Sequence, residues 1–439
     1  MMTPLALLNG TEKESLSSGD MFHSGGALFD WPILNPAMEK AILDVLARRA
    51  MSGTELTREF EDRFAAWHGG GYAIGHCNGT AALQCALYGV GLGAGDELIC
   101  PSITFWASCA SALALGAGIV FAEVDRDTLC LDPDDLEKRI TPRTKAIMAV
   151  HYLGHPAPMD RIMAIARKHG LKVVEDCSHA HGARYRGRLV GTFGDAAGFS
   201  LMTAKGFAVG EGGILLTGNR EVYERALLFG HYERHSELTI PELKAQAGLP
   251  LGGYKYRMHQ MSSAIALEQL KKFPAEMAEV DRAMNCFWDA LEGLPGIRSH
   301  RPTEPDSSKG AWFCPHGLYR AEELHGLSIG RFCAALRAEG VRIAAPGCNA
   351  PLHEHALFRS IDVYGSGRPT NFSANQSLPV SETIQDEIFY VPWFKRYEPE
   401  TIARYSDVFR HVIEHHEALL PGDTDRRQTA GSWALSVRN

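Results

Sequence analysis

The sequence predicts an α/β protein whose first 270 residues form a largely parallel β-sheet. Short apolar runs alternate with segments whose apolar residues recur at helical spacing, and Gly, Pro or Asp separates the two. At 439 residues the chain is also long enough for a large core and two structural domains. Strands that alternate with helices in this way are typical of a parallel sheet.

Seven apolar runs are expected to be strands: 72–77, 97–101, 119–125, 146–152, 171–176, 196–201 and 212–218. Helices are expected at 37–49, 55–69, 79–91, 104–116 and 160–170. Ligands of such sheets bind beyond the carboxyl ends of the strands. We therefore expect the ligand-binding and catalytic residues at those ends.

The pattern changes beyond residue 270. A long helix is expected at 262–294, bent at Pro274, and shorter segments at 317–321, 328–340 and 341–345 precede a last helix at 400–420. These elements indicate a smaller α+β domain. The expected organisation is an N-terminal arm, a large domain, a small domain and a disordered tail, at 1–27, 28–270, 271–421 and 422–439.

Composition excludes several classes of function. A net charge of −8 gives no electrostatic reason to expect a nucleic acid or an anionic membrane as partner. No apolar stretch approaches the roughly 18 residues of a membrane span. The ten cysteines show no CxxC pair and no zinc-type spacing with histidine, so they are expected to be reduced and no metal site is expected. We expect a cytoplasmic protein.

Polar residues at the ends of several expected strands indicate a binding site. The run 171–176 ends in Glu175-Asp176, and a buried carboxylate is costly unless a cation meets it. Gly79 and Thr80 open a helix directly after a strand, where an anion such as phosphate is favoured. Ser200 ends another strand and could add a hydroxyl to the same anion.

Two further residues complete a chemical description of the ligand. Lys205 follows Ser200 in a glycine-rich segment and could reach a carbonyl carried by the phosphate-bearing ligand. Phe105 could lie flat on an aromatic ring. A phosphate, a carbonyl for a lysine, a ring and a protonated nitrogen for Asp176 together describe pyridoxal 5′-phosphate.

The order of the motifs then resembles the DegT/StrS family of fold-type I pyridoxal-phosphate aminotransferases, which act on keto sugars and keto cyclitols. The matching pieces are NGTAAL, PSITF, VHYLGHPAPMD, EDCSHAHGARYRGRLVGTFGD, FSLMTAKGFAVGEGG and GYKYRMHQMSSAIALEQL. The resemblance implies a large domain with a mostly parallel seven-stranded sheet, followed by a smaller α+β domain.

The resemblance also assigns roles to single residues. Lys205 matches the lysine that bonds to the cofactor and moves the proton, Asp176 matches the partner of the ring nitrogen, and His179 matches the residue near the ring hydroxyl. Phe105 matches the stacking aromatic. The phosphate cup is matched by Gly79, Thr80, Ala81 and Ser200.

One position departs from the family. Where the family usually has an asparagine that the partner subunit donates to the phosphate, this chain has Lys255 in GYKYRM. The resemblance implies a homodimer with shared active sites, in which Lys255 pairs with the phosphate dianion. A merely solvated Lys255 is the alternative.

The implied function is the transfer of an amino group from an amino acid, glutamine or glutamate, to a keto sugar or keto cyclitol in aminosugar or antibiotic biosynthesis. The sequence EDCSHAHGA and the segment Trp31-Pro32 favour the branch of this family that contains aminocyclitol aminotransferases and 3-amino-5-hydroxybenzoate synthases. Two alternatives remain: a dehydratase or aromatising lyase of the synthase type, and a cofactor-binding regulatory partner without turnover. Lys205, Asp176 and His179 together favour turnover.

Overall fold

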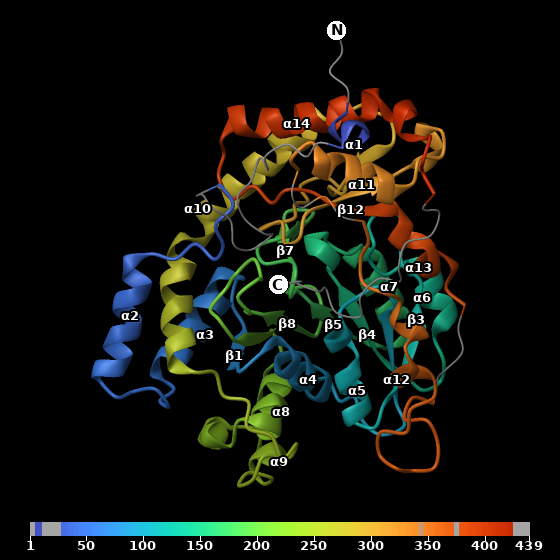
Figure 1. Cartoon of the computed structure of the whole chain (residues 1–439). Coiled ribbons are helices and arrows are strands. Elements are labelled where there is room, and N and C mark those ends of the chain that lie inside the picture. Colours follow the sequence, from blue (N-terminus) through green and yellow to red (C-terminus); the bar gives the residue numbers. More distant parts are fainter. Residues whose placement is uncertain (1–4, 11–27, 342–343, 345, 373–376, 425–439) are drawn as a thin grey trace.

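A large central sheet with helices around it, and a smaller unit at one end, make up the computed structural model (Figure 1). The structure describes residues 5–10, 28–341, 344, 346–372 and 377–424. Most of the expected arm at 1–27, most of the expected strand at 341–345 and most of the expected tail at 422–439 lie outside these ranges.

The central sheet has seven strands in the order β1-β9-β8-β5-β4-β2-β3. Their bounds are β1 (Tyr72–His76), β2 (Glu97–Pro101), β3 (Gly118–Ala122), β4 (Thr144–Val150), β5 (Lys172–Asp176), β8 (Ala196–Ser200) and β9 (Gly213–Thr217). Strand β9 runs antiparallel to both of its neighbours, and the other pairs are parallel. The predicted mostly parallel seven-stranded sheet is confirmed, because each of the seven apolar runs forms one of its strands.

Helices cover both faces of this sheet. The ring of Phe199 on β8 lies 5.2 Å, centroid to centroid, from Phe64 on α3 (Glu55–Trp67). Its neighbour Gly198 lies against Leu83 on α4 (Gly79–Gly89). Consecutive strand residues point to opposite faces, so α3 and α4 lie on opposite sides of the sheet. Outside α3, α2 (Pro36–Ala47) packs against α10 (Gln260–Ala290), and Figure 1 shows the two running side by side.

The smaller unit contains a three-stranded antiparallel sheet of β10 (Ile297–Ser299), β11 (His316–Tyr319) and β12 (Ile388–Tyr390). It also contains α11 (Ile329–Ala338) and α14 (Pro399–Glu414). Helix α10 packs against α3 of the large unit and α14 of the small one, so the proposed domain boundary at 270 falls inside this helix. The buried apolar side chains form one continuous cluster that reaches both sheets.

The remaining elements are shorter or connect the strands. They are α1 (Ala6–Asn9), α5 (Ala110–Ala114), α6 (Pro133–Leu136), α7 (Met159–His169), β6 (Arg184–Tyr185), β7 (Arg188–Leu189), α8 (Arg220–Gly230), α9 (Pro241–Lys244), α12 (Ala356–Arg359) and α13 (Pro379–Thr383). The single helix expected at 104–116 is wrong, since a 3-10 turn at Trp106–Ser108 and the short α5 occupy that segment. Of the helices in the described ranges, none has both the length and the apolar character that crossing a bilayer requires.

Candidate active site

A cavity of about 260 Å³ lies beyond the carboxyl ends of the parallel strands, where ligands of such sheets bind. Asp176 ends β5 and Ser200 ends β8, and both line it. The small unit closes it with Phe313, Cys314 and Tyr390. The other predicted site residues that line this cavity are Gly79, Thr80, Phe105, His179 and Lys205.

Asp176 is fixed by hydrogen bonds to both of its carboxylate oxygens. The hydroxyl of Ser108 donates to Oδ2 over 2.7 Å, and the backbone N–H of Ser178 donates to Oδ1 over 3.0 Å. The hydroxyls of Ser108 and Thr104 are themselves 2.8 Å apart. These side-chain bonds give the segment after β2 an alternative to regular helical pairing. The carboxylate is therefore oriented before any ligand enters.

The adjacent acid, Glu175, has a structural role. It accepts backbone hydrogen bonds of 2.7 Å from Gly191, Phe193 and Gly194, and its carboxylate lies 3.0 Å from Nε2 of the buried His151. Burial by itself would raise the pKa of Glu175, but these hydrogen bonds hold it below its usual value. Of the two acids that end β5, only Asp176 lines the cavity.

Lys205 is buried, and its amine loses its proton more easily than the amine of an exposed lysine. Burial lowers the pKa of its amine from 10.5 to about 8, with a smaller opposing effect from the carboxylate of Asp176. Its Nζ lies 4.3 Å from the ring centroid of Phe313, and the indole N–H of Trp31 donates to its backbone carbonyl over 3.1 Å. Near neutral pH a larger share of this amine is nucleophilic than in an exposed lysine.

His179 is held as a neutral ring. Its Nδ1 accepts a hydrogen bond of 3.3 Å from the backbone N–H of Leu153, which places the proton on Nε2. Burial, reinforced by the charge of Lys205, keeps the pKa of this ring well below its usual value. The ring stacks on Phe313 with 4.6 Å between centroids. Nε2 is therefore a hydrogen-bond donor.

The start of α4 gives the cavity one end that is suited to binding an anion, the anion-binding end. The side chain of Asn78 caps the helix by accepting from the backbone N–H of Ala81 over 2.8 Å. Among the described residues nothing accepts from the N–H groups of Gly79 and Thr80, so both are free to bind an anion. A Cβ on Gly79 would lie 2.6 Å from Cβ of Ser200, so only glycine allows α4 to approach β8 this closely.

Two predicted site residues lie elsewhere. The N–H of Ala81 is bonded to Asn78, and Ala81 does not line the cavity. Lys255 is exposed on the segment that precedes α10, outside the cavity lining of its own chain. Among the described lining residues, Lys205 is the one lysine or arginine. Apart from Lys205, the described lining therefore offers no lysine or arginine to an anion at the start of α4.

Sequence reasoning missed several lining residues. Ser178 lines the cavity and its hydroxyl accepts from the backbone N–H of Ser200 over 3.1 Å. Its position two residues after Asp176 was a usable signal, because β5 ends there. Phe313 and Tyr390 come from distant parts of the chain, and no local pattern marks either of them.

Comparison with known proteins agrees with this geometry. Residues 33–410 match the DegT/DnrJ/EryC1/StrS aminotransferase family. The chain is 34% identical to the L-glutamine:2-deoxy-scyllo-inosose aminotransferase of Micromonospora echinospora, over 93% of this chain and 94% of that protein.

Two solved structures are similar in fold. An aminotransferase from Psychrobacter cryohalolentis superposes with a TM-score of 0.76 at 27% identity, covering 89% of this chain and all of the other. A 3-amino-5-hydroxybenzoic acid synthase superposes with a TM-score of 0.74 at 25% identity, covering 88% and 99%.

Proposed function

This chain belongs to the DegT/DnrJ/EryC1/StrS aminotransferase family, and we propose that it uses pyridoxal 5′-phosphate to transfer the amino group of L-glutamine to a keto cyclitol. The observation that carries this proposal is that Lys205, Asp176 and the open start of α4 surround one cavity. The name of the Micromonospora relative supplies the donor and the class of acceptor.

The residues around the cavity fit this cofactor. The free N–H groups of Gly79 and Thr80, with the hydroxyl of Ser200, suit a phosphate. The carboxylate of Asp176 suits a protonated ring nitrogen, and the ring of Phe105 suits stacking. When bound, the cofactor supplies a carbonyl carbon that takes up the amino group and a ring that withdraws electrons.

Each side chain then has a distinct task. The neutral amine of Lys205 would take the proton from the amine-bearing carbon of the donor and deliver it to the carbon of the cofactor that takes up the amino group. The negative charge of Asp176 would keep the ring nitrogen protonated, and Ser108 and Ser178 hold its carboxylate in place. Nε2–H of His179 would be available to donate to the ring oxygen of the cofactor, and the ring of His179 stacks on Phe313, which covers the site from the side of the small unit.

We propose a homodimer in which Lys255 of each chain binds the phosphate in its partner's site. The proposal is supported by the described lining, which contains no lysine or arginine other than Lys205. Exposed apolar residues on the same segment also support it: Leu249 is 79% exposed, Leu251 46% and Tyr254 36%. Apolar surface of this kind is typical of protein interfaces. A two-fold axis would let each chain complete the other's site.

We propose that the protein is cytoplasmic and that it acts in antibiotic or aminosugar biosynthesis. None of the ten cysteines, all of which lie in the described ranges, forms a disulfide, as expected in the reducing cytoplasm. The product of a keto cyclitol acceptor is an aminocyclitol, which fits antibiotic or aminosugar biosynthesis.

A second candidate is a dehydratase or aromatising lyase, and the likeness to 3-amino-5-hydroxybenzoic acid synthase favours it. The two functions differ in their products. A lyase turns over a cyclic amino keto acid with loss of water and a new aromatic absorbance, and it needs no net amino donor. An aminotransferase needs both substrates.

The proposed function is tested with purified protein, pyridoxal phosphate, L-glutamine and 2-deoxy-scyllo-inosose. We expect mass spectrometry to detect the aminocyclitol together with the keto acid derived from glutamine, in equal amounts. Lys205→Ala is the matched control and should yield neither product. Replacing the inosose with nucleotide-linked keto sugars tests the acceptor class, and turnover of those sugars alone would contradict the cyclitol assignment.

A further inference from the structure

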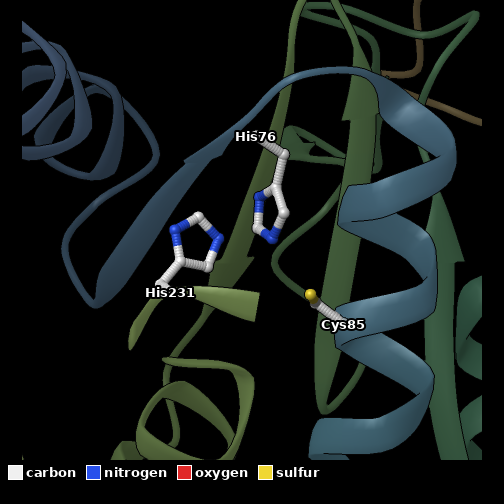
Figure 2. Close-up of side chains that lie close together, drawn as sticks. All are labelled: His76, Cys85 and His231. Carbon is white, nitrogen blue, oxygen red and sulfur yellow. The ribbon is translucent and has the colours of Figure 1, made fainter. Parts of the chain in front are cut away.

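A second group of chemically active side chains lies close to the phosphate-binding turn but outside the cavity. It consists of His76 at the end of β1, Cys85 on α4 and His231, which directly follows α8 (Figure 2). His76 and Cys85 are 0% exposed, and His231 is 1% exposed. One nitrogen of each ring and Sγ of Cys85 all lie within 4.8 Å of one another. The proposed function uses none of these residues.

Each of the two imidazole rings has one nitrogen, Nε2, that makes no hydrogen bond to the described residues. Nδ1 of His76 lies 2.8 Å from the carbonyl oxygen of Ile74, which can only accept, so Nδ1 carries the proton and Nε2 has a lone pair. Nδ1 of His231 lies 3.6 Å from the carboxylate of Glu233, a contact between an acid and an imidazole that is longer than a hydrogen bond and leaves Nε2 on the other side of the ring. Among the described residues neither Nε2 has a hydrogen-bond partner. Burying two such lone pairs is costly unless something binds them.

We propose that these three residues bind one Zn²⁺ ion through Nε2 of His76, Nε2 of His231 and Sγ of Cys85. Zinc takes imidazole nitrogen and thiolate sulfur as ligands in tetrahedral sites. The thiol of Cys85 loses its proton to solvent when the Zn–S bond forms. The carbonyl of Ile74 is the kind of outer partner that metal-bound histidines have, and the carboxylate of Glu233, 3.6 Å from Nδ1 of His231, would become one after a small approach. One position remains for water.

The spacing is close to that of a zinc site. Tetrahedral zinc places nitrogen and sulfur ligands about 3.3–3.7 Å apart. The present upper limit of 4.8 Å requires side-chain shifts of roughly an ångström to reach that spacing. Another buried group, His151, Glu175 and Cys177, offers a contrast. Its carboxylate already accepts three backbone hydrogen bonds and the contact from His151, so it leaves nothing for an ion to satisfy.

The ion would join three separate parts of the large unit. His76 lies three residues before Gly79, and Cys85 lies on α4, the helix whose start would bind the phosphate in the proposed function. Through His231, the ion would also be bonded to the segment that follows α8. The ion would therefore anchor the phosphate-binding turn, and its removal should lower both the melting temperature and the affinity for pyridoxal phosphate.

The test is metal analysis of the full-length protein purified from zinc-supplemented cells and dialysed. We expect one equivalent of zinc per chain in the wild type and in Cys333→Ala, which removes another buried cysteine, on α11. Cys85→Ala and His231→Ala should lose it. Full zinc in the doubly substituted His76→Ala/Cys85→Ala protein would overturn the proposal, as would a wild type that stays metal-free after incubation with Zn²⁺.

A spectroscopic measurement on the wild type does not depend on how well the variants fold. Replacing zinc with Co²⁺ should produce a near-ultraviolet thiolate-to-cobalt charge-transfer band that saturates at one equivalent. A cobalt spectrum without the thiolate band would overturn the assignment of Cys85. Neither measurement uses catalytic activity, so the zinc site and the proposed transamination can fail independently.

Discussion

The hydroxyl of Ser108 donates a 2.7 Å hydrogen bond to Oδ2 of Asp176, and so links the 3-10 turn after β2 to the end of β5. The carboxylate is held in one orientation by the protein itself. The charge of Asp176 and its orientation can therefore be tested separately.

Replacing Asp176 with asparagine should keep the fold and lower kcat roughly 10²–10³-fold, the cost typical of removing one preorganised electrostatic partner. The amide is nearly isosteric but cannot hold a proton on the ring nitrogen. Steady-state kinetics at saturating cofactor measure the effect. Ser108→Ala is the control for orientation and should cost much less. Equal losses in the two variants would show that position matters and charge does not.

The covalent binding of pyridoxal phosphate by the apoenzyme should become faster as pH rises. The midpoint of this increase should lie near pH 8, because the pKa of Lys205 is about 8. The amine attacks only when neutral, and burial depresses its pKa, so the neutral form dominates above about 8 instead of above 10.5. Stopped-flow absorbance of cofactor binding gives the profile, and Lys205→Ala should show no such pH-dependent covalent phase. A midpoint near 10.5 would mean that the amine is solvated.

Gly79→Ala should weaken cofactor binding at least tenfold and destabilise the protein by roughly 1–3 kcal/mol, as overpacking does. The added Cβ would lie 2.6 Å from Cβ of Ser200 and would push α4 away from β8. Fluorescence titration and thermal unfolding measure the two effects. Gly93→Ala is the matched control, because a Cβ there meets nothing within 4 Å. Normal cofactor affinity in Gly79→Ala would show that this contact can relax.

Mixing Lys205→Ala chains with Lys255→Glu chains should restore part of the activity that each variant lacks alone. If Lys255 acts across the dimer, a mixed dimer has one site with both lesions and one site with neither. Activity after confirmed subunit exchange is the measurement. Lys244→Glu, a charge reversal at another exposed lysine in this region, should be active without mixing. Full activity of Lys255→Glu alone would make Lys255 a surface residue.

The strands of the large sheet could be predicted from local pattern because strands buried on both faces are continuous apolar runs. Their order could not, since nothing within 72–77 indicates that β1 pairs with β9. Strands β10 and β12 have three residues each, which is too short for a periodic signal. Helix α8 was not predicted although its sequence has a periodic signal. Val222, Ala226 and Phe229 recur at helical spacing, and Asn219 caps the helix.

The candidate site divides in the same way. Lys205 and Asp176 stand in motifs that lie next to strand ends, so sequence and resemblance together predicted that they would meet. The hydroxyl of Ser108 looks like an ordinary polar residue of a helix until folding brings β2 and β5 close together. The contribution of Phe313 depends on how the small unit packs against the large one, and a local pattern contains no information about that packing.

The pairing of β1 with β9 also sets an order of events during synthesis. Tyr72 pairs with Thr217, so β1 leaves the ribosome long before its neighbour in the sheet exists. Contacts of such sequence separation form slowly, and unpaired strand edges invite association between chains. Gly79 cannot meet Ser200 until this part of the sheet is complete. A nascent or truncated chain that ends before β9 would contain Lys205 but not the assembled start of α4 against β8, so it should retain the cofactor poorly, and cofactor loading should follow synthesis of most of the large unit.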